Sequence, residues 1–193
     1  MKPFLNRMYA GAVFYPTYWY NCYMTSPAGS WKWWSRLDDQ VIIGARPSEK
    51  VVRELAALGV TAVINTCEEY AGPTEIYEEL GIEQLHLPTV DFQPPTLRDV
   101  ELGVDYIEKQ VAAGKQVYIH CKAGRARSAT IVICWLMKSK GMTPAEGHAF
   151  LLEKRPQTIR SLIKREVVQA YYRELKAEGK PPSGTGGPPI HET

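Results

Sequence analysis

The sequence predicts an α/β fold in which a central, mainly parallel sheet is flanked by helices. Short apolar runs alternate with longer amphipathic runs along the middle of the chain, which is the order that β-α units produce. Ser or Thr precedes several of the amphipathic runs and Gly follows them, as helix caps require. These signals place the folded domain at residues 37–176.

The first half of this domain predicts three strands and two helices. One helix is capped by Ser48 and ends at Gly59, and a shorter helix ends before Gly81. The third apolar run alternates at period two, which is typical of a strand. The expected strands are Val41–Ile43, Val60–Asn65 and Ile82–Leu87.

The second half predicts one more strand among four helices. Thr96 caps a long helix that ends at Gly114, and strand Gln116–His120 follows it. Ser128–Lys140 is helical and almost entirely apolar, as a central buried helix would be. The last two expected helices are one opened by the capping box Thr143–Glu146, with proline at its first position, and one from about residue 162 to 175.

The two flanks of the domain differ from it in composition. Residues 1–36 hold more than half of the aromatic side chains and precede the first acidic residue, Asp38. Aromatic and basic residues suit a membrane interface, so we expect a membrane-associating or targeting leader there; the alternative is an extension that packs its aromatics on the domain. Residues 177–193, rich in Gly and Pro, predict a disordered tail.

Charge and cysteine content narrow the class of protein. The net charge is only +2, so nucleic acid is not an expected partner. Leu151–Arg165 carries five basic residues and one acidic residue, which predicts either a solvated face or a surface that attracts an anionic substrate. The four cysteines form no CxxC pair, so neither zinc nor a disulfide framework is expected. Cys67 and Cys134 lie in apolar runs and are expected in the core.

The chemistry lies between strand Gln116–His120 and the helix that follows. Cys121 and Arg127 are separated by five residues, a loop short enough to surround one tetrahedral anion with its backbone N–H groups. Arg127 offers a planar fork that matches two phosphate oxygens. The expected phosphate-binding residues of the loop are Lys122, Ala123, Gly124, Arg125 and Ala126.

The same loop predicts a nucleophile. A helix N-terminus and an arginine both favour thiolate, so Cys121 is the expected attacking group. The alternative is a buried structural cysteine with arginines nearby by chance. Ser128 is placed to stabilise the sulfur when the thiolate leaves, and His120 is expected to orient the loop. A nucleotide-binding P-loop is not indicated, because Gly-Lys-Ser/Thr is missing at the required spacing.

Cleavage of a phosphate ester also needs a proton for the leaving oxygen. Asp91 follows the strand that precedes the long helix. Loops after neighbouring parallel strands meet at one edge of a sheet, so Asp91 could face Cys121. Taken alone, Asp91 would more readily be a turn or helix-approach residue, but with the nucleophile motif present it is the expected general acid.

His120, Cys121, Arg127 and Ser128 at this spacing, with Asp91 upstream, resemble the dual-specificity branch of the protein tyrosine phosphatases. The resemblance implies that Cys121 forms a phosphocysteine while Arg127 holds the phosphoryl oxygens. It also implies that Asp91 protonates the leaving oxygen and then deprotonates the hydrolytic water. No metal and no other cofactor is implied.

A closer similarity is to the mitochondrial phosphatase family that dephosphorylates phosphatidylglycerophosphate on the route to cardiolipin. It covers roughly residues 12–175 and departs at Ala71, where that family usually carries another acidic residue. It implies an anionic phospholipid substrate at a membrane surface and says nothing of protein partners. The implied location is the mitochondrial inner membrane in a eukaryote, and otherwise the membrane periphery or cytoplasm. The similar segments are Phe14–Thr17, Glu68–Tyr70, Leu85–Asp91 and His120–Thr130.

Three other functions are alternatives to a lipid phosphatase. A dual-specificity phosphatase acting on phosphotyrosine, phosphoserine or phosphothreonine shares the chemistry, and only the family similarity and the leader favour lipid. A phosphoresidue-binding module without activity is expected to lack Cys121, Arg127 or Asp91, and all three are present. A rhodanese-like or arsenate-reducing enzyme would not need Asp91.

Overall fold

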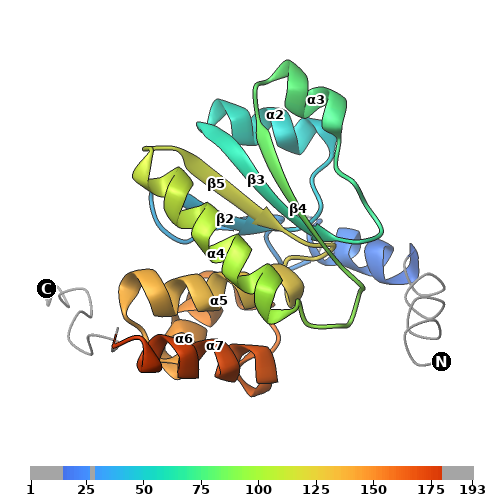
Figure 1. Cartoon of the computed structure of the whole chain (residues 1–193). Helices are drawn as coiled ribbons and strands as arrows, with labels where there is room; N and C mark the ends of the chain where they lie inside the picture. The colour runs from blue at the N-terminus through green and yellow to red at the C-terminus, as the bar shows by residue number, and fades with distance from the viewer. Residues whose placement is uncertain (1–14, 27–28, 180–193) are drawn as a thin grey trace, which may run out of the picture.

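The computed structural model describes residues 15–26 and 29–179, and it contains a five-stranded sheet between two layers of helices (Figure 1). The first 14 residues of the predicted leader and the predicted tail from residue 180 onward lie outside the described residues. Within the described part of the chain, no helix is long and apolar enough to cross a membrane.

The sheet has the strand order β1-β2-β5-β3-β4, and all neighbouring strands are parallel except β1 and β2. This confirms the mainly parallel sheet. Strand β1 was missed and lies inside the range predicted as leader, because a three-residue edge strand shows no periodicity of its own. The bounds are β1 Trp34–Arg36, β2 Val41–Gly44, β3 Val60–Cys67, β4 Glu83–Thr89 and β5 Gln116–His120.

The predicted helix caps are confirmed. Ser48, Thr96 and Thr143 each accept a hydrogen bond from a first-turn backbone N–H, and the last two form full capping boxes. The final helix was placed too early, because a 3-10 turn at Leu162–Lys164 precedes it. The helices are α2 Glu49–Ala57, α3 Thr74–Glu79, α4 Leu97–Ala112, α5 Arg127–Lys140, α6 Pro144–Lys154 and α7 Glu166–Ala177.

Each central strand contributes to two separate cores. Val117 and Ile119 of β5 face the larger core, formed with α4, α5, α6 and α7, while Tyr118 between them faces the smaller core under α2 and α3. Strands β2 and β3 alternate in the same way. Helix α5 is buried from Arg127 to Met137, as its apolar sequence predicted.

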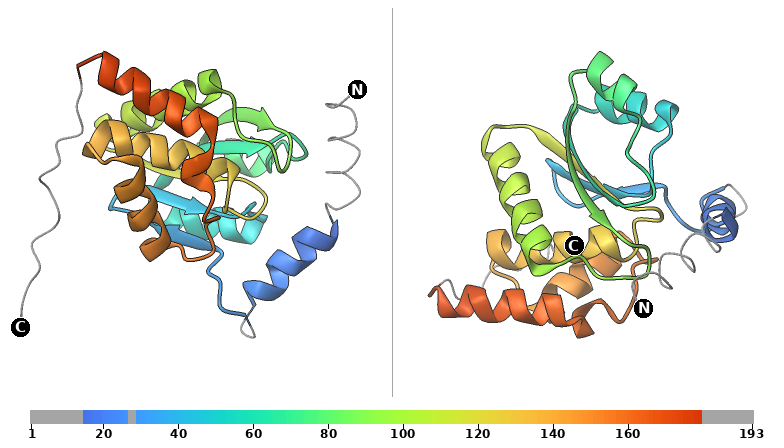
Figure 2. Two further views of the ribbon diagram at one scale, coloured as in Figure 1. Left: turned by 90° about the horizontal axis from the view of Figure 1, so that it is seen from below. Right: turned by 45° about the vertical axis from the view of Figure 1, so that its right-hand side comes forward.

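The sheet topology gathers the chemistry at one edge. Strands β3, β4 and β5 are parallel, so the segments after them emerge together. Residues 15–24 form one more helix, called here the N-terminal helix, which lies at the edge of the domain (Figure 2). Its contacts with the loop after β5 are described below.

Candidate active site

The loop between β5 and α5 is shaped as an anion cradle. Gly124 has φ +63, and a Cβ added there would lie 2.3 Å from the carbonyl oxygen of Gly44. Only glycine fits both conditions. Thr66 fixes the start of the loop, since its hydroxyl donates to the carbonyl of His120 at 2.9 Å. The backbone N–H of Gly124 donates to the sulfur of Cys121 at 3.2 Å.

Cys121 is set up as a thiolate. Burial alone would raise the pKa of its thiol, but the charge of Arg127 and hydrogen bonds from Ser128 and the loop backbone lower that pKa to about 7. The hydroxyl of Ser128 lies 3.4 Å from the sulfur. Both residues therefore lie where the sequence placed them, and their roles stay predictions.

Arg127 is almost completely buried and is held from two sides. Its two Nη atoms donate to the carboxylate of Glu69 at 2.7 and 2.6 Å, and Nη1 also donates to the carbonyl of Thr89 at 2.8 Å. Burial alone would lower the pKa of Arg127, but the hydrogen bonds to Glu69 keep it above its usual range. The sequence marks Glu69 only as part of the segment Glu68–Tyr70 that resembles the lipid phosphatase family, and it does not predict the ion pair with Arg127.

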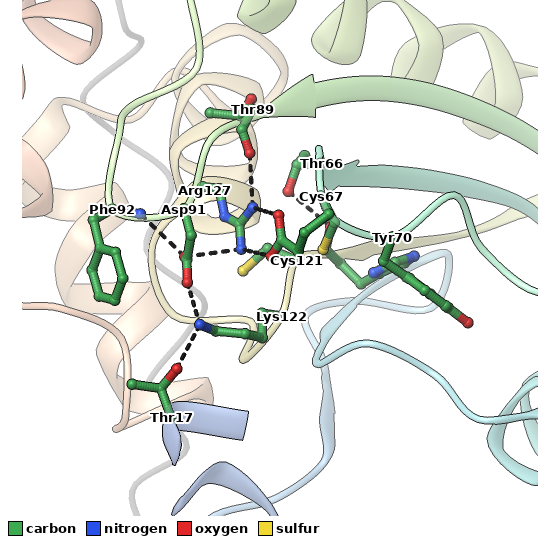
Figure 3. Close-up of polar contacts among 12 residues, drawn as sticks. Thr17, Thr66, Cys67, Tyr70, Thr89, Asp91, Phe92, Cys121, Lys122 and Arg127 are labelled. Carbon is green, nitrogen blue, oxygen red and sulfur yellow. Dashed lines mark hydrogen bonds and ion pairs between the residues drawn. The ribbon is translucent and has the colours of Figure 1, made fainter. Parts of the chain in front are cut away.

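Asp91 faces the same pocket as Cys121, as predicted from the sheet edge. Its carboxylate forms ion pairs with Lys122 and with Nη2 of Arg127, the latter at 2.9 Å (Figure 3). The next residue, Phe92, has φ 65, which is rare for an aromatic side chain and is often found near functional sites. Its ring is half-exposed at the pocket.

Lys122 binds protein groups rather than pointing into the loop. Its ammonium donates to the carboxylate of Asp91 and, at 2.6 Å, to the hydroxyl of Thr17 (Figure 3). Lys122 thus joins the loop that carries Asp91 to the N-terminal helix. Arg125 lies at the rim of the pocket, where its guanidinium stacks 4.5 Å from the ring centre of Trp31 and donates to the carbonyl of Gln157. The carbonyl of Ala123 accepts from the buried Arg155, and the carbonyl of Ala126 accepts from the partly buried Arg165.

Arg155 is an exception to the solvated face predicted for Leu151–Arg165, in which Lys154, Arg160 and Lys164 are exposed. Arg155 is completely buried beneath the loop. It donates to the carbonyls of Gly124 at 2.6 Å and Ala123 at 3.0 Å, and also to Lys32 and Ser35. Burial lowers the pKa of Arg155 to about 10, so the group stays charged at neutral pH. A linear run of charges cannot show which side chain turns inward.

Burial keeps His120, Cys67 and Cys134 in their neutral forms. Burial lowers the pKa of His120 to about 3, so it is neutral, which suits a residue that orients the loop. Cys67 and Cys134 are buried as predicted, and burial raises the pKa of both thiols. Cys121 is thus the thiol prepared for chemistry among the buried cysteines.

The N-terminal helix completes the pocket, which the sequence did not predict. The pocket has a volume of about 250 Å³. Thr17, Tyr20 and Asn21 line it together with Cys121. Tyr18 secures the helix, since the guanidinium of Arg46 lies 4.5 Å from the centre of its ring. The packing alternative for the leader therefore holds for part of it.

Comparison with known proteins gives a family. The family model "Dual specificity phosphatase, catalytic domain" matches residues 41–173. The phosphatidylglycerophosphate phosphatase PTPMT2 of Arabidopsis thaliana is 37% identical over 164 residues, which cover 83% of this chain and 72% of that protein. The phosphatidylglycerophosphatase and protein-tyrosine phosphatase 1 of Homo sapiens is 32% identical, over 87% of this chain and 88% of that protein.

Solved phosphatase structures are also similar to this chain in sequence and fold. The crystal structure of PTPMT1 in complex with PI(5)P is 32% identical to this chain, with a TM-score of 0.70. The match covers 77% of this chain and 99% of that chain. The structure of Tk-PTP in its active form is 31% identical, with a TM-score of 0.68, over 75% of this chain and 99% of that chain.

The pKa of Cys121 predicts its reactivity. In a Cys22→Ala background, alkylation by iodoacetamide should reach half its maximal rate near pH 7, because the thiolate is the reactive form. Ser128→Ala should move this midpoint to higher pH, since a hydrogen bond to the thiolate is lost. Mass spectrometry of the alkylated protein measures both. A midpoint near the ordinary thiol value of 9.0 would contradict this account of the loop.

The buried Arg155 predicts a large effect of its removal. Arg155→Met should lower the free energy of unfolding by about 2–5 kcal/mol, because several buried carbonyls lose their donor. Arg125→Ala, in the same loop but at the rim, should cost less than about 1 kcal/mol. Urea unfolding compares the two variants. Equal losses would mean that Arg155 does not support the loop.

Proposed function

The chain belongs to the dual-specificity phosphatase family, alongside the phosphatidylglycerophosphate phosphatases, and is a cysteine-dependent phosphatase; we propose that it converts phosphatidylglycerophosphate to phosphatidylglycerol at a membrane surface. The observation that carries the proposal is the position of the N-terminal helix, which lines the pocket above Cys121 and also exposes aromatic side chains.

The chemistry uses groups already in contact. The Cys121 thiolate attacks phosphorus, and an S–P bond forms as the P–O bond to the glycerol breaks. Asp91, a carboxylate while it is paired with Lys122 and Arg127, takes up a proton from solvent when the substrate displaces it and gives that proton to the leaving oxygen. It then takes a proton from the water that attacks the phosphocysteine, and the S–P bond breaks to release phosphate. Ser128 stabilises the departing thiolate through its hydroxyl, 3.4 Å away.

Binding of the phosphate requires an exchange of partners at Arg127. Glu69 and the carbonyl of Thr89 fix the guanidinium from behind, while Asp91 takes Nη2 on the pocket side. A phosphoryl oxygen carries the same charge as the Asp91 carboxylate and competes for that donor. Substrate binding therefore releases Asp91 toward the leaving group.

Exposed aromatic side chains favour a membrane-bound substrate. Tyr15, Trp19 and Tyr23 are 64, 68 and 61% exposed and share one face of the N-terminal helix at a spacing of four residues. Phe92, at the pocket, is 51% exposed. Aromatic rings of this kind settle in the headgroup region of a bilayer. Docked through these rings, the pocket would meet a lipid phosphate without extracting the lipid.

The relatives also guide the proposed location. Two proteins named for phosphatidylglycerophosphate phosphatase activity carry the PTPMT name. Together with the family resemblance of the sequence, this similarity supports a mitochondrial protein, and we propose that the chain acts at the mitochondrial inner membrane. Fractionation of the cells that produce it would test the location independently of the reaction.

The general acid predicts a dependence on the leaving group. Asp91→Asn should slow hydrolysis of phosphatidylglycerophosphate by about 10²–10⁴-fold, because an alkoxide leaves poorly without a proton. The loss should be much smaller for an aryl phosphate, which has a good leaving group. Asp105→Asn, which changes an exposed carboxylate on α4, is the matched control and should leave both rates unchanged. An equal loss on both substrates would assign Asp91 a structural role.

The aromatic face predicts membrane binding. Replacement of Tyr15, Trp19 and Tyr23 by Ser should weaken co-sedimentation with phosphatidylglycerol vesicles about tenfold or more, because the interfacial contacts are lost. Hydrolysis of a soluble aryl phosphate should stay within about twofold, since these three rings lie outside the pocket lining. Leu58→Ser with Leu102→Ser, at exposed sites elsewhere, is the matched control. Unchanged sedimentation of the triple variant would contradict membrane docking through this helix.

A further inference from the structure

Asn21 is an unusual side chain in this pocket. It is only 2% exposed, and within the described residues neither its amide nitrogen nor its amide oxygen has a hydrogen-bond partner. It lines the same pocket as Cys121, Lys122 and Asp91. Buried polar groups are nearly always paired in native proteins, so an unpaired amide beside a nucleophile indicates a missing ligand.

The position of Asn21 is fixed by its neighbours on the N-terminal helix. Thr17, one turn earlier, accepts a hydrogen bond from Lys122 at 2.6 Å. Tyr20 packs edge-on against Trp31, with ring centres 5.7 Å apart. The helix is thus held at the loop and at the rim, and the amide between these contacts cannot turn to solvent without undocking the helix.

The pocket has room for more than a phosphate group. The pocket volume is about 250 Å³ and one water molecule needs about 10–15 Å³ by the same measure, which leaves room for a phosphate and for further heavy atoms. Phosphate itself has five heavy atoms, four of which the loop and Arg127 would surround. Thr17, Tyr20 and Asn21 of the N-terminal helix form part of the wall around the remaining space.

The chemistry of the amide selects the kind of group that fills this space. An Asn side chain offers two N–H donors and a carbonyl acceptor, which matches a hydroxyl that both donates and accepts. Arg125 and Arg165 also line the pocket, but a guanidinium only donates and suits phosphate oxygens. A hydroxyl-bearing leaving group fits the amide better than an aromatic or aliphatic one.

We propose that Asn21 recognises the hydroxyl groups of a polyol, such as glycerol, esterified to the scissile phosphate, and that it determines specificity for polyol phosphates. This rests on the proposed function in so far as phosphatidylglycerophosphate carries such a glycerol. Thr17 and Lys122 act as positioning residues that hold the helix, and so the amide, against the loop.

A matched pair of soluble substrates tests the proposal. Glycerol 3-phosphate and 1-propyl phosphate differ only in two hydroxyl groups, and neither needs a membrane. The wild-type protein should hydrolyse glycerol 3-phosphate with a kcat/KM about tenfold higher or more, because the amide pairs with a hydroxyl. In Asn21→Leu this ratio should fall to near one, while kcat/KM for 1-propyl phosphate stays within about threefold.

Two further variants separate recognition from folding. Asn21→Ser keeps a donor and an acceptor and should retain part of the ratio. Cys22→Ala, the next residue on the helix and outside the pocket lining, should leave the ratio unchanged. The Tm of Asn21→Leu should equal or exceed that of the wild type, since an unpaired buried amide is replaced by an apolar group of similar size. A lower Tm with equal losses on both substrates would overturn the proposal and make Asn21 structural.

The lipid substrate is tested apart from Asn21. Wild-type protein is compared on phosphatidylglycerophosphate vesicles and on phosphotyrosine peptides. If the peptides are better substrates but Asn21→Leu still abolishes the preference for glycerol 3-phosphate, the lipid assignment fails and the role of Asn21 stands. If vesicles are preferred but the ratio is the same in Asn21→Leu and wild type, the proposal for Asn21 is overturned, and an ordered water satisfies the amide.

Discussion

The positive charge buried at the phosphate loop is the constraint on which the rest of the site depends. Arg127, which follows the loop, and Arg155, which donates to two of its carbonyls, have almost no exposed surface. Removing a guanidinium from water is costly, so each must be surrounded by acceptors. Arg127 has the carboxylates of Glu69 and Asp91, whereas the acceptors of Arg155 are carbonyls and a hydroxyl. The loop is therefore prepared for an anion before one arrives.

Arg155 and Arg127 differ in their contacts and in the roles that we assign to them. Arg155 ties the carbonyls of Gly124 and Ala123 to those of Lys32 and Trp33, and so joins the loop to the segment before β1. These hydrogen bonds from Arg155 keep the loop in a shape in which loop backbone N–H groups, such as that of Gly124, point toward the sulfur of Cys121. In the proposed reaction, Arg127 instead exchanges Asp91 for phosphate, and its ion pair with Glu69 would keep the guanidinium oriented during the exchange. We therefore assign a structural role to Arg155 and a chemical role to Arg127, of which the sequence motif marks only Arg127.

Local signals explain what the sequence predicted well. Helix caps at Ser48, Thr96 and Thr143 and the Cys121–Arg127 spacing act over a few residues, so they can be recognised without tertiary structure. Glu69 and Arg155 could not be recognised, because their partners lie far away in the chain. Strand β1 depends on its pairing with β2 rather than on its own pattern. The contacts of the N-terminal helix with the pocket could not be predicted for the same reason, since its composition suited both a membrane-associating leader and an extension packed on the domain.

The two faces of the N-terminal helix link recognition to location. Thr17 and Asn21 face the pocket, while Tyr15, Trp19 and Tyr23 are exposed, so one short element would contact both the headgroup and the bilayer. Lys122 extends the link to chemistry, because its ammonium contacts both Thr17 and the Asp91 carboxylate. A bilayer that positions this helix would thereby position the wall of the pocket and the partner of the general acid. Substrate selection then depends on where the helix docks as well as on which groups the loop can bind.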